Sequence, residues 1–239
     1  MYGFAQGSWC LLLYFLICVA VAFSIRLLFH IPTEVFRKLL HWVLLGSLAV
    51  WLWAFARWQH ALLAVACFLA LVYPLLYLAQ HHLPGYSRFV TERKEGELKH
   101  SFVLVFTTFA ALVAVGWGLF DDKNLCLAAI CAWGPGDAAA ALMGKRFGRH
   151  KLQGQHIEGC KSVEGSAAML LVSFAFVLPV LLLRGDLSAG VCVGAALICA
   201  AVTAVVELFS LRGNDTVFCP LAAMAVLLPI TLLAGGDQL

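Results

Sequence analysis

Long apolar runs alternate with short polar segments along the whole chain of 239 residues. About 20 apolar residues in a helix cross the roughly 30 Å hydrocarbon core of a bilayer, so each run is long enough for one span. The fifth run carries Gly134, Pro135 and Gly136 in its later half, and we expect that helix to be broken or kinked there. We predict eight transmembrane helices, at residues 8 to 29, 40 to 56, 61 to 80, 101 to 120, 124 to 143, 164 to 183, 187 to 209 and 217 to 234.

The composition supports an all-α polytopic integral membrane protein. The chain is 63% hydrophobic and 12% charged, which a soluble domain cannot hide from water. The spans leave no room for a separate soluble domain, so we expect a single transmembrane domain over residues 1 to 239. A net charge of +3 is too small to indicate nucleic-acid binding. The first run has no basic residue before it and no cleavage site after it, which favours a retained span over a signal peptide.

The basic residues predict the orientation of the chain. Of the 16 Lys and Arg residues, 13 lie on or beside loops one, three, five and seven, and three lie on the even loops. Positive charge is enriched in cytoplasmic loops, so we expect the odd loops inside and both termini outside. The three exceptions are Arg57, Lys123 and Arg184.

Asp137 is the first candidate for chemistry, because it lies on a predicted span. A carboxylate inside a membrane costs about 2.5 to 3.5 kcal/mol on insertion scales and is a functional hypothesis by default, the alternative being a helix-end residue at headgroup level. The alanines from Ala138 to Ala141 would let a backbone or a ligand approach closely. The basic, glycine-containing stretch that follows matches neither a Walker A loop nor a dinucleotide fingerprint. It still offers backbone N–H groups and cations to phosphates, through the candidates Gly136, Gly144, Lys145, Arg146 and Lys151.

Five further candidates lie in or near the fifth and seventh loops. Lys161 and Ser162 precede the sixth span, where a helix start binds anions, although Ser162 also suits an ordinary helix cap. Glu207 and Asp215, with Asn214 beside the latter, would offer Mg²⁺ the oxygen ligands it prefers, with substrate phosphates completing its shell. The alternative for Glu207 is an ion pair with a nearby Lys or Arg.

Two more groups lie on the first and third loops. Arg37 and His41 are four residues apart and share a helix face, as in an ordinary basic interfacial helix. Arg93 and Glu97 precede the fourth span, where a solvated run of charges is the alternative.

Taken in order, these residues resemble the family of CTP-dependent lipid-alcohol kinases, which includes phytol kinase, dolichol kinase and the CTP-using diacylglycerol kinase of fungi. The resemblance runs from Arg37 to about Pro220, and one element departs from it, since the family usually reads Asp-Asn where this chain has Asn214-Asp215. The matching elements are Arg37-Lys38-x-x-His41, Arg93-Lys94-x-Gly96-Glu97, Gly136-Asp137-x-x-Ala140-x-x-x-Gly144-x-x-Phe147-Gly148, Lys151, Lys161-Ser162-x-Glu164-Gly165-Ser166 and Glu207.

The resemblance implies transfer of the γ-phosphoryl group of CTP to the hydroxyl of a membrane lipid alcohol, such as phytol, a polyprenol or diacylglycerol. It implies that Asp137 binds Mg²⁺ or orients the lipid hydroxyl, with Glu207 and Asp215 assisting in catalysis and metal binding. The triphosphate would be held by Lys145, Arg146, Lys151 and Lys161. Arg37, His41, Arg93 and Glu97 would complete the mouth of the site. The expected location is a bacterial inner (plasma) membrane with the site facing the cytoplasm.

Two other functions stay open at this point. Cytidylyl transfer to phosphatidate would use the same nucleotide and release pyrophosphate, but the chain lacks the long acidic, glycine-rich terminal signature associated with those enzymes. A transporter would commonly show repeats and helices broken near the midplane, whereas this chain shows no repeat and its polar residues gather at one membrane face. The oligomeric state stays open as well.

Overall fold

The structure, a computed structural model, is all-α and confirms the eight predicted spans. It describes residues 3–29, 31–82, 96–152, 154, 157, 161–211 and 213–235. Within these residues, eight helices are long and apolar enough to cross a membrane, and no strand occurs beyond an isolated bridge between Lys151 and Ser162. The helices are α1 (Phe4–Phe29), α2 (Thr33–Ala54), α3 (Trp58–His82), α5 (Glu97–Leu112), which continues into the π-helix η1 (Val113–Leu119), α6 (Lys123–Phe147), α7 (Val163–Arg184), α8 (Ala189–Phe209) and α9 (Asp215–Gly235).

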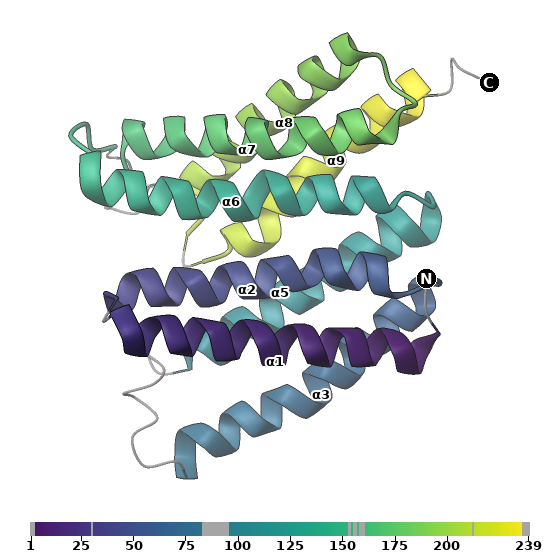
Figure 1. Ribbon diagram of the computed structural model, residues 1–239. Helices are drawn as coiled ribbons and strands as arrows, with labels where there is room; N and C mark the ends of the chain where they lie inside the picture. The colour runs from purple at the N-terminus through teal and green to yellow at the C-terminus, as the bar shows by residue number, and fades with distance from the viewer. Residues whose placement is uncertain are drawn as a thin grey trace. The chain divides into compact units, whose positions relative to one another are not determined.

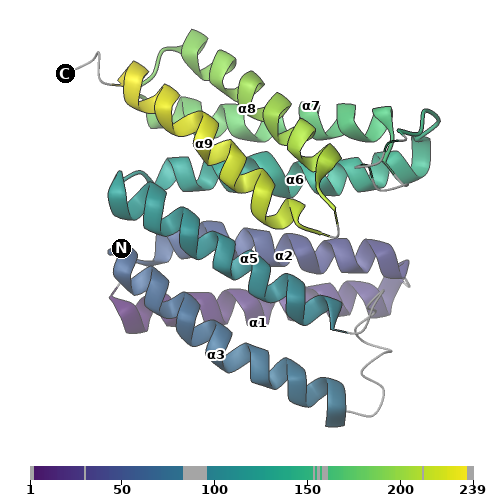
Figure 2. The same cartoon turned by 180° about the vertical axis from the view of Figure 1, so that it is seen from behind.

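The chain folds as two compact units, Met1–Ala114 and Val115–Leu239. The first contains α1, α2, α3 and α5, with α1 beside α2 and α3 beside α5 (Figures 1 and 2). An aromatic cluster holds it together, because the buried Trp51 contacts Phe68, Phe106 and Phe109. Both units belong to one polytopic chain. The single transmembrane domain over residues 1 to 239 stays a prediction.

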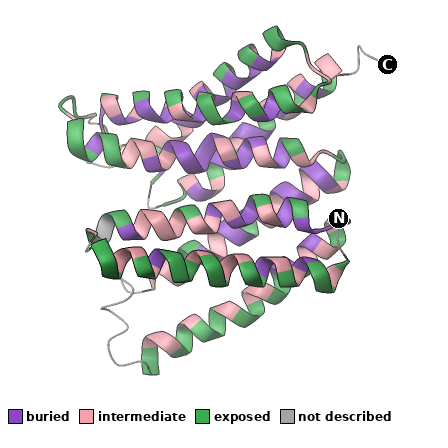
Figure 3. Ribbon diagram, viewed as in Figure 1, coloured by how far each residue is buried: buried purple, intermediate pink, exposed green. Residues whose placement is uncertain are grey.

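In the second unit α6 is the central helix. It packs against α7 and α9, while α8 packs against both α7 and α9 (Figure 2). Small residues along α6 let its neighbours approach closely, as in many membrane helix pairs. Buried positions accordingly concentrate along α6, whereas α1 and α3 expose most of their apolar side chains (Figure 3). Polar residues that α6 carries are therefore placed by protein contacts.

Local chemistry explains where these helices begin. The side chains of Asp122, Ser162 and Ser188 accept hydrogen bonds from backbone N–H groups in the first turns of α6, α7 and α8, at 2.8, 3.2 and 3.4 Å. Such caps satisfy N–H groups that have no partner within the helix. Ser162 is thus the helix cap that the sequence allowed. At the other end of α7, Gly185 takes the left-handed conformation (φ 77°) that glycine adopts without a steric cost.

The prediction of a break in the fifth span is wrong. Helix α6 runs through Pro135 from Lys123 to Phe147 without interruption. Proline removes one helix hydrogen bond and crowds the preceding turn, and the Ser173 hydroxyl of α7 donates to the carbonyl of Ala132 in that turn. This hydrogen bond joins α7 to the turn of α6 that precedes Pro135.

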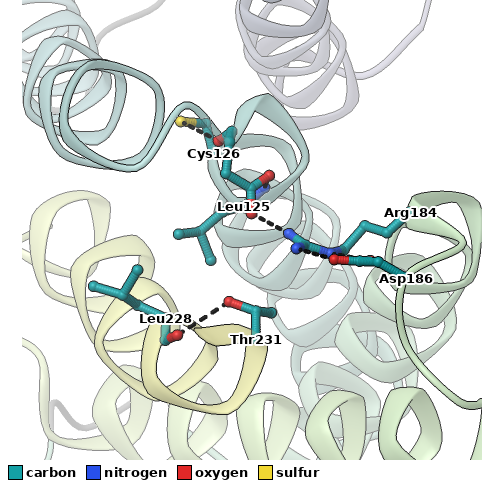
Figure 4. Close-up of polar contacts among 7 residues, drawn as sticks. Leu125, Cys126, Arg184, Asp186, Leu228 and Thr231 are labelled. Atoms are coloured by element: carbon teal, nitrogen blue, oxygen red, sulfur yellow. Dashed lines mark hydrogen bonds and ion pairs between the residues drawn. The ribbon is translucent and has the colours of Figure 1, made fainter. Parts of the chain in front are cut away.

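Charged side chains meet at the end of the second unit where α6 begins and α7 ends. Arg184, at the end of α7, bonds Asp122 at the start of α6. It also contacts Asp186 at 2.7 Å (Figure 4). The hydrogen bond from Arg184 lowers the pKa of Asp186 below its ordinary value. The Asp186 carboxylate therefore stays ionised at neutral pH, and the link between α7 and α6 is the pair of Arg184 with Asp122.

Candidate functional site

The candidate residues of the second unit gather where the start of α7, the end of α8 and the start of α9 lie beside the later half of α6. Asp137 lies on the later half of α6, Lys161 just before α7, Glu207 in the last turn of α8 and Asp215 at the start of α9. The antiparallel course of these helices brings the end of α6 beside the start of α7, and the end of α8 beside the start of α9 (Figure 1). Four segments distant in sequence thus form one polar site at one end of the helix bundle.

This polar site has an excess of negative charge. The carboxylates of Asp137, Glu207 and Asp215 are close enough for the charges of the first two to act on the third, and Lys161 acts on it with the opposite sign. All four residues are partly buried, so solvent screens their interactions less than at an open surface. Three carboxylates facing one ammonium favour a further cation at this place.

The Lys161 side chain points to the end of α8. Its ammonium contacts Glu207 Oε1 at 3.0 Å, and it donates to the backbone carbonyls of Glu207 and Ser210, the latter at 3.3 Å. A cation suits these last carbonyls, because they carry the negative end of the helix dipole. Lys161 precedes α7, as predicted, but its ammonium points to the end of α8 and joins α7 to α8. The ion pair that the sequence left as an alternative for Glu207 is present.

Trp133 is a member of this site that the sequence argument missed. Its indole N–H donates to Asp215 Oδ2 at 3.4 Å. The signal lay in the spacing, because Trp133 precedes Asp137 by four residues and shares its helix face. Tryptophan reads as an apolar residue in the sequence pattern, although its indole N–H can donate a hydrogen bond.

Close contact between α6 and α7 is built on glycines. A Cβ atom on Gly148 would lie 2.7 Å from the hydroxyl oxygen of Ser162, the cap of α7, and one on Gly165 would lie 3.0 Å from the carbonyl oxygen of Ala140. A Cβ on Gly136 would meet the side chains of Ser173 and Met169. Gly136 and Gly144, proposed above for phosphate binding, thus lie buried in this helix contact. As expected, the alanine run of α6 lets another backbone, that of α7 at Gly165, approach closely.

The connection between α6 and α7 folds back along itself. Lys151 and Ser162 form the isolated bridge, and Leu152 N donates to Lys161 O at 3.0 Å. Glu164 of α7 contacts His150 Nδ1 at 2.7 Å and accepts from its backbone N–H. The cations Lys145, Arg146 and Lys151 are exposed around this connection. At the start of α9, Asn214 is exposed and its carbonyl accepts from Val217 and Phe218.

The site suits a metal ion that completes its shell on a substrate. In the part of the chain that the structure describes, no three His, Cys, Asp or Glu side chains are arranged to hold an ion by themselves. Glu207 is engaged by Lys161, so direct binding of a metal by Glu207 requires that pair to open. Asp137 and Asp215 are the other two carboxylates of the site, and the charge of Asp137 acts on Asp215. Mg²⁺ characteristically takes one or two carboxylates together with substrate phosphates and water, so these residues fit it.

The remaining candidates belong to the first unit. Arg37 and His41 are partly buried on one face of α2, in the first unit. Helix α2 begins at Thr33, so it includes Arg37 as well as His41, whereas the prediction of a span from residue 40 had left Arg37 outside. Arg93 and the side chain of Glu97 lie outside the described residues.

Comparison with known proteins gives one informative relative. The chain is 31% identical to the phytol kinase of Synechocystis sp. over 203 residues, which is 82% of this chain and 78% of the relative. No family model and no solved structure matches the chain. The matched length is large enough to include the segments of α6, α7, α8 and α9 that form the site.

Proposed function

Because this chain belongs to the family of phytol kinase, and is therefore a lipid kinase, we propose that it transfers the γ-phosphoryl group of CTP to the hydroxyl group of a membrane lipid alcohol. The observation that supports this most directly is the polar site formed by α6, α7, α8 and α9, where Asp215 is under the charges of two further carboxylates and of Lys161, which pairs with Glu207. Phosphoryl transfer depends mainly on positioning and on neutralising phosphate charge. Partly buried acids and a lysine at the membrane surface suit both tasks.

The carboxylates have two tasks in this proposal. Asp137 and Asp215 would hold Mg²⁺ beside the nucleotide phosphates. When bound, the ion would neutralise the negative charge of the phosphates. A carboxylate of the site also orients the lipid hydroxyl and accepts its proton as the oxygen bonds to phosphorus. The bond from phosphorus to the β-γ bridging oxygen then breaks, and CDP leaves.

The cations have a separate task. Lys145, Arg146 and Lys151 lie exposed around the α6–α7 connection, where they meet the triphosphate as it arrives. Lys161 is held by Glu207 beside the carboxylates, so its charge lies where the transferred group passes. The choice of CTP over ATP rests on the resemblance of the ordered motifs to CTP-dependent kinases.

Product analysis tests this function. Protein purified into lipid nanodiscs is supplied with Mg²⁺, γ-labelled CTP and a panel of phytol, farnesol, a longer polyprenol and diacylglycerol. We expect label in one phosphorylated lipid and release of CDP, with ATP a much weaker donor. Release of pyrophosphate would indicate cytidylyl transfer instead. If no alcohol is phosphorylated by any nucleotide, the proposal is wrong, and transport becomes the function to test.

We propose further that the site faces the cytoplasm, where CTP is found, with both termini outside. The basis is the distribution of Lys and Arg, with 13 on or beside the odd loops and three on the even loops. A membrane-impermeant maleimide, corrected for labelling of the parent protein, should label Ala189→Cys in intact cells, and Lys151→Cys only after permeabilisation. The reverse pattern would invert the orientation.

A further inference from the structure

The indole N–H of Trp133 has an unusual hydrogen-bond acceptor, a carboxylate. It is 2% exposed, and a buried indole N–H needs an acceptor. In the first unit the buried Trp51 finds an ordinary one, the backbone carbonyl of Ala61 at 3.1 Å. Trp133 instead donates to Asp215 Oδ2, on a helix that begins 82 residues later in the chain. A partly buried carboxylate is thus held by a rigid neutral donor.

The surroundings of Asp215 explain why such a donor matters. Asp137 and Glu207 repel its charge, and Lys161, which attracts it, is engaged by Glu207. A carboxylate among like charges tends to turn away from them or to take up a proton. The indole N–H opposes both outcomes, because it stabilises the ionised form and engages one of the two oxygens.

Trp133 also links the two acids that the proposed function assigns to the metal. Trp133 and Asp137 lie one helical turn apart on the same face of α6. Helix α6 therefore presents the Asp137 carboxylate and the Trp133 N–H to Asp215 together. A rotation of α6 or a slide of α9 would disturb both contacts at once.

We propose that Trp133 is a positioning residue for the kinase reaction: its indole N–H fixes Asp215 so that the second carboxylate oxygen, Oδ1, is directed to Mg²⁺ and the nucleotide phosphates. This inference rests on the proposed function. It assigns Trp133 no contact with the substrate, because Trp133 acts through Asp215. Partners that orient metal ligands typically change metal affinity about 10- to 100-fold when removed.

The test uses Trp133→Phe, which keeps an aromatic ring and removes the N–H donor. We expect the Mg²⁺ concentration for half-maximal activity to rise about tenfold, with a much smaller change in KM for the lipid alcohol. Trp51→Phe is the matched control, because it also removes one buried indole hydrogen bond. It should lower thermal stability to a similar extent and leave the Mg²⁺ dependence unchanged. Should Trp133→Phe fail to fold, benzothienylalanine at position 133 keeps the bicyclic shape and lacks the N–H.

A second readout does not depend on turnover. Binding of Mg²⁺ at Asp215 changes the electric field at the Trp133 ring, so Mg²⁺ should shift the tryptophan emission of the parent protein and of Trp51→Phe. The shift should be absent in Trp133→Phe and reduced in Asp215→Asn. The inference is wrong if the parent shows no Mg²⁺ response, or if Trp133→Phe keeps both the emission shift and the parent's Mg²⁺ dependence. Failure of the proposed function looks different, because the parent then phosphorylates no alcohol at any Mg²⁺ concentration.

Discussion

Asp137→Asn is expected to lower phosphoryl transfer by at least about a hundredfold while the protein stays inserted and folded. The amide keeps the size of the side chain and one oxygen but removes the charge that a hard cation requires. Loss of a metal ligand costs several kcal/mol of transition-state stabilisation, and each 1.36 kcal/mol is about tenfold in rate. Turnover of the labelled nucleotide at saturating Mg²⁺ and equal protein measures this loss.

The structure also predicts how the stability of Asp137→Asn behaves. Asp137 repels Asp215, so neutralising it relieves a like-charge contact and lowers the cost of placing a carboxylate in the membrane. The melting temperature should therefore stay the same or rise slightly. Asp186→Asn, at the opposite end of the second unit, is the matched control and should keep nearly the parent's turnover. Turnover of Asp137→Asn within about threefold of the parent would contradict the metal role and shift it to Glu207 and Asp215.

Lys161→Met is expected to destabilise the protein and to remove its stabilisation by CTP with Mg²⁺. Lys161 and Glu207 are only 17% and 12% exposed, so the methionine variant leaves a carboxylate nearly buried without its ammonium. Removing one partner of a buried pair costs roughly 3 to 5 kcal/mol, and residual solvent makes us expect about 2 to 4 kcal/mol. The last carbonyls of α8 lose their cation as well. Thermal unfolding with and without CTP measures both effects.

The double variant Lys161→Met with Glu207→Gln separates the two roles of Lys161. Neutralising Glu207 removes the unpaired charge, so most of the lost stability should return. Stabilisation by CTP should stay absent, because the cation beside the phosphates is still missing. Recovery of both properties would mean that Lys161 only joins α7 to α8. Recovery of neither would mean that the carbonyl contacts of Lys161, and not the ion pair, carry the stability.

Residues that act through their immediate neighbours in the chain could be assigned before the structure was known. Ser162 is a helix cap because its hydroxyl reaches an N–H three residues away, and this contact depends on local geometry alone. Asp137 stood out because a carboxylate in an apolar run is costly wherever the helix packs. Ser173 shows the limit of such reasoning, because only packing of α7 brings its hydroxyl to the carbonyl of Ala132 in α6.

The sequence by itself determined the number of spans, their approximate bounds and the acids worth testing. These follow from the fixed thickness of the bilayer and from the transfer cost of each side chain, which are properties of single segments. Only the tertiary structure decided that Lys161 pairs with Glu207 and that Trp133 holds Asp215, over separations of 46 and 82 residues. These contacts depend on how each helix is rotated against its neighbours. In a bilayer, where apolar side chains gain as much from lipid as from protein, that rotation is set by close packing of residues such as Gly136 and Gly165.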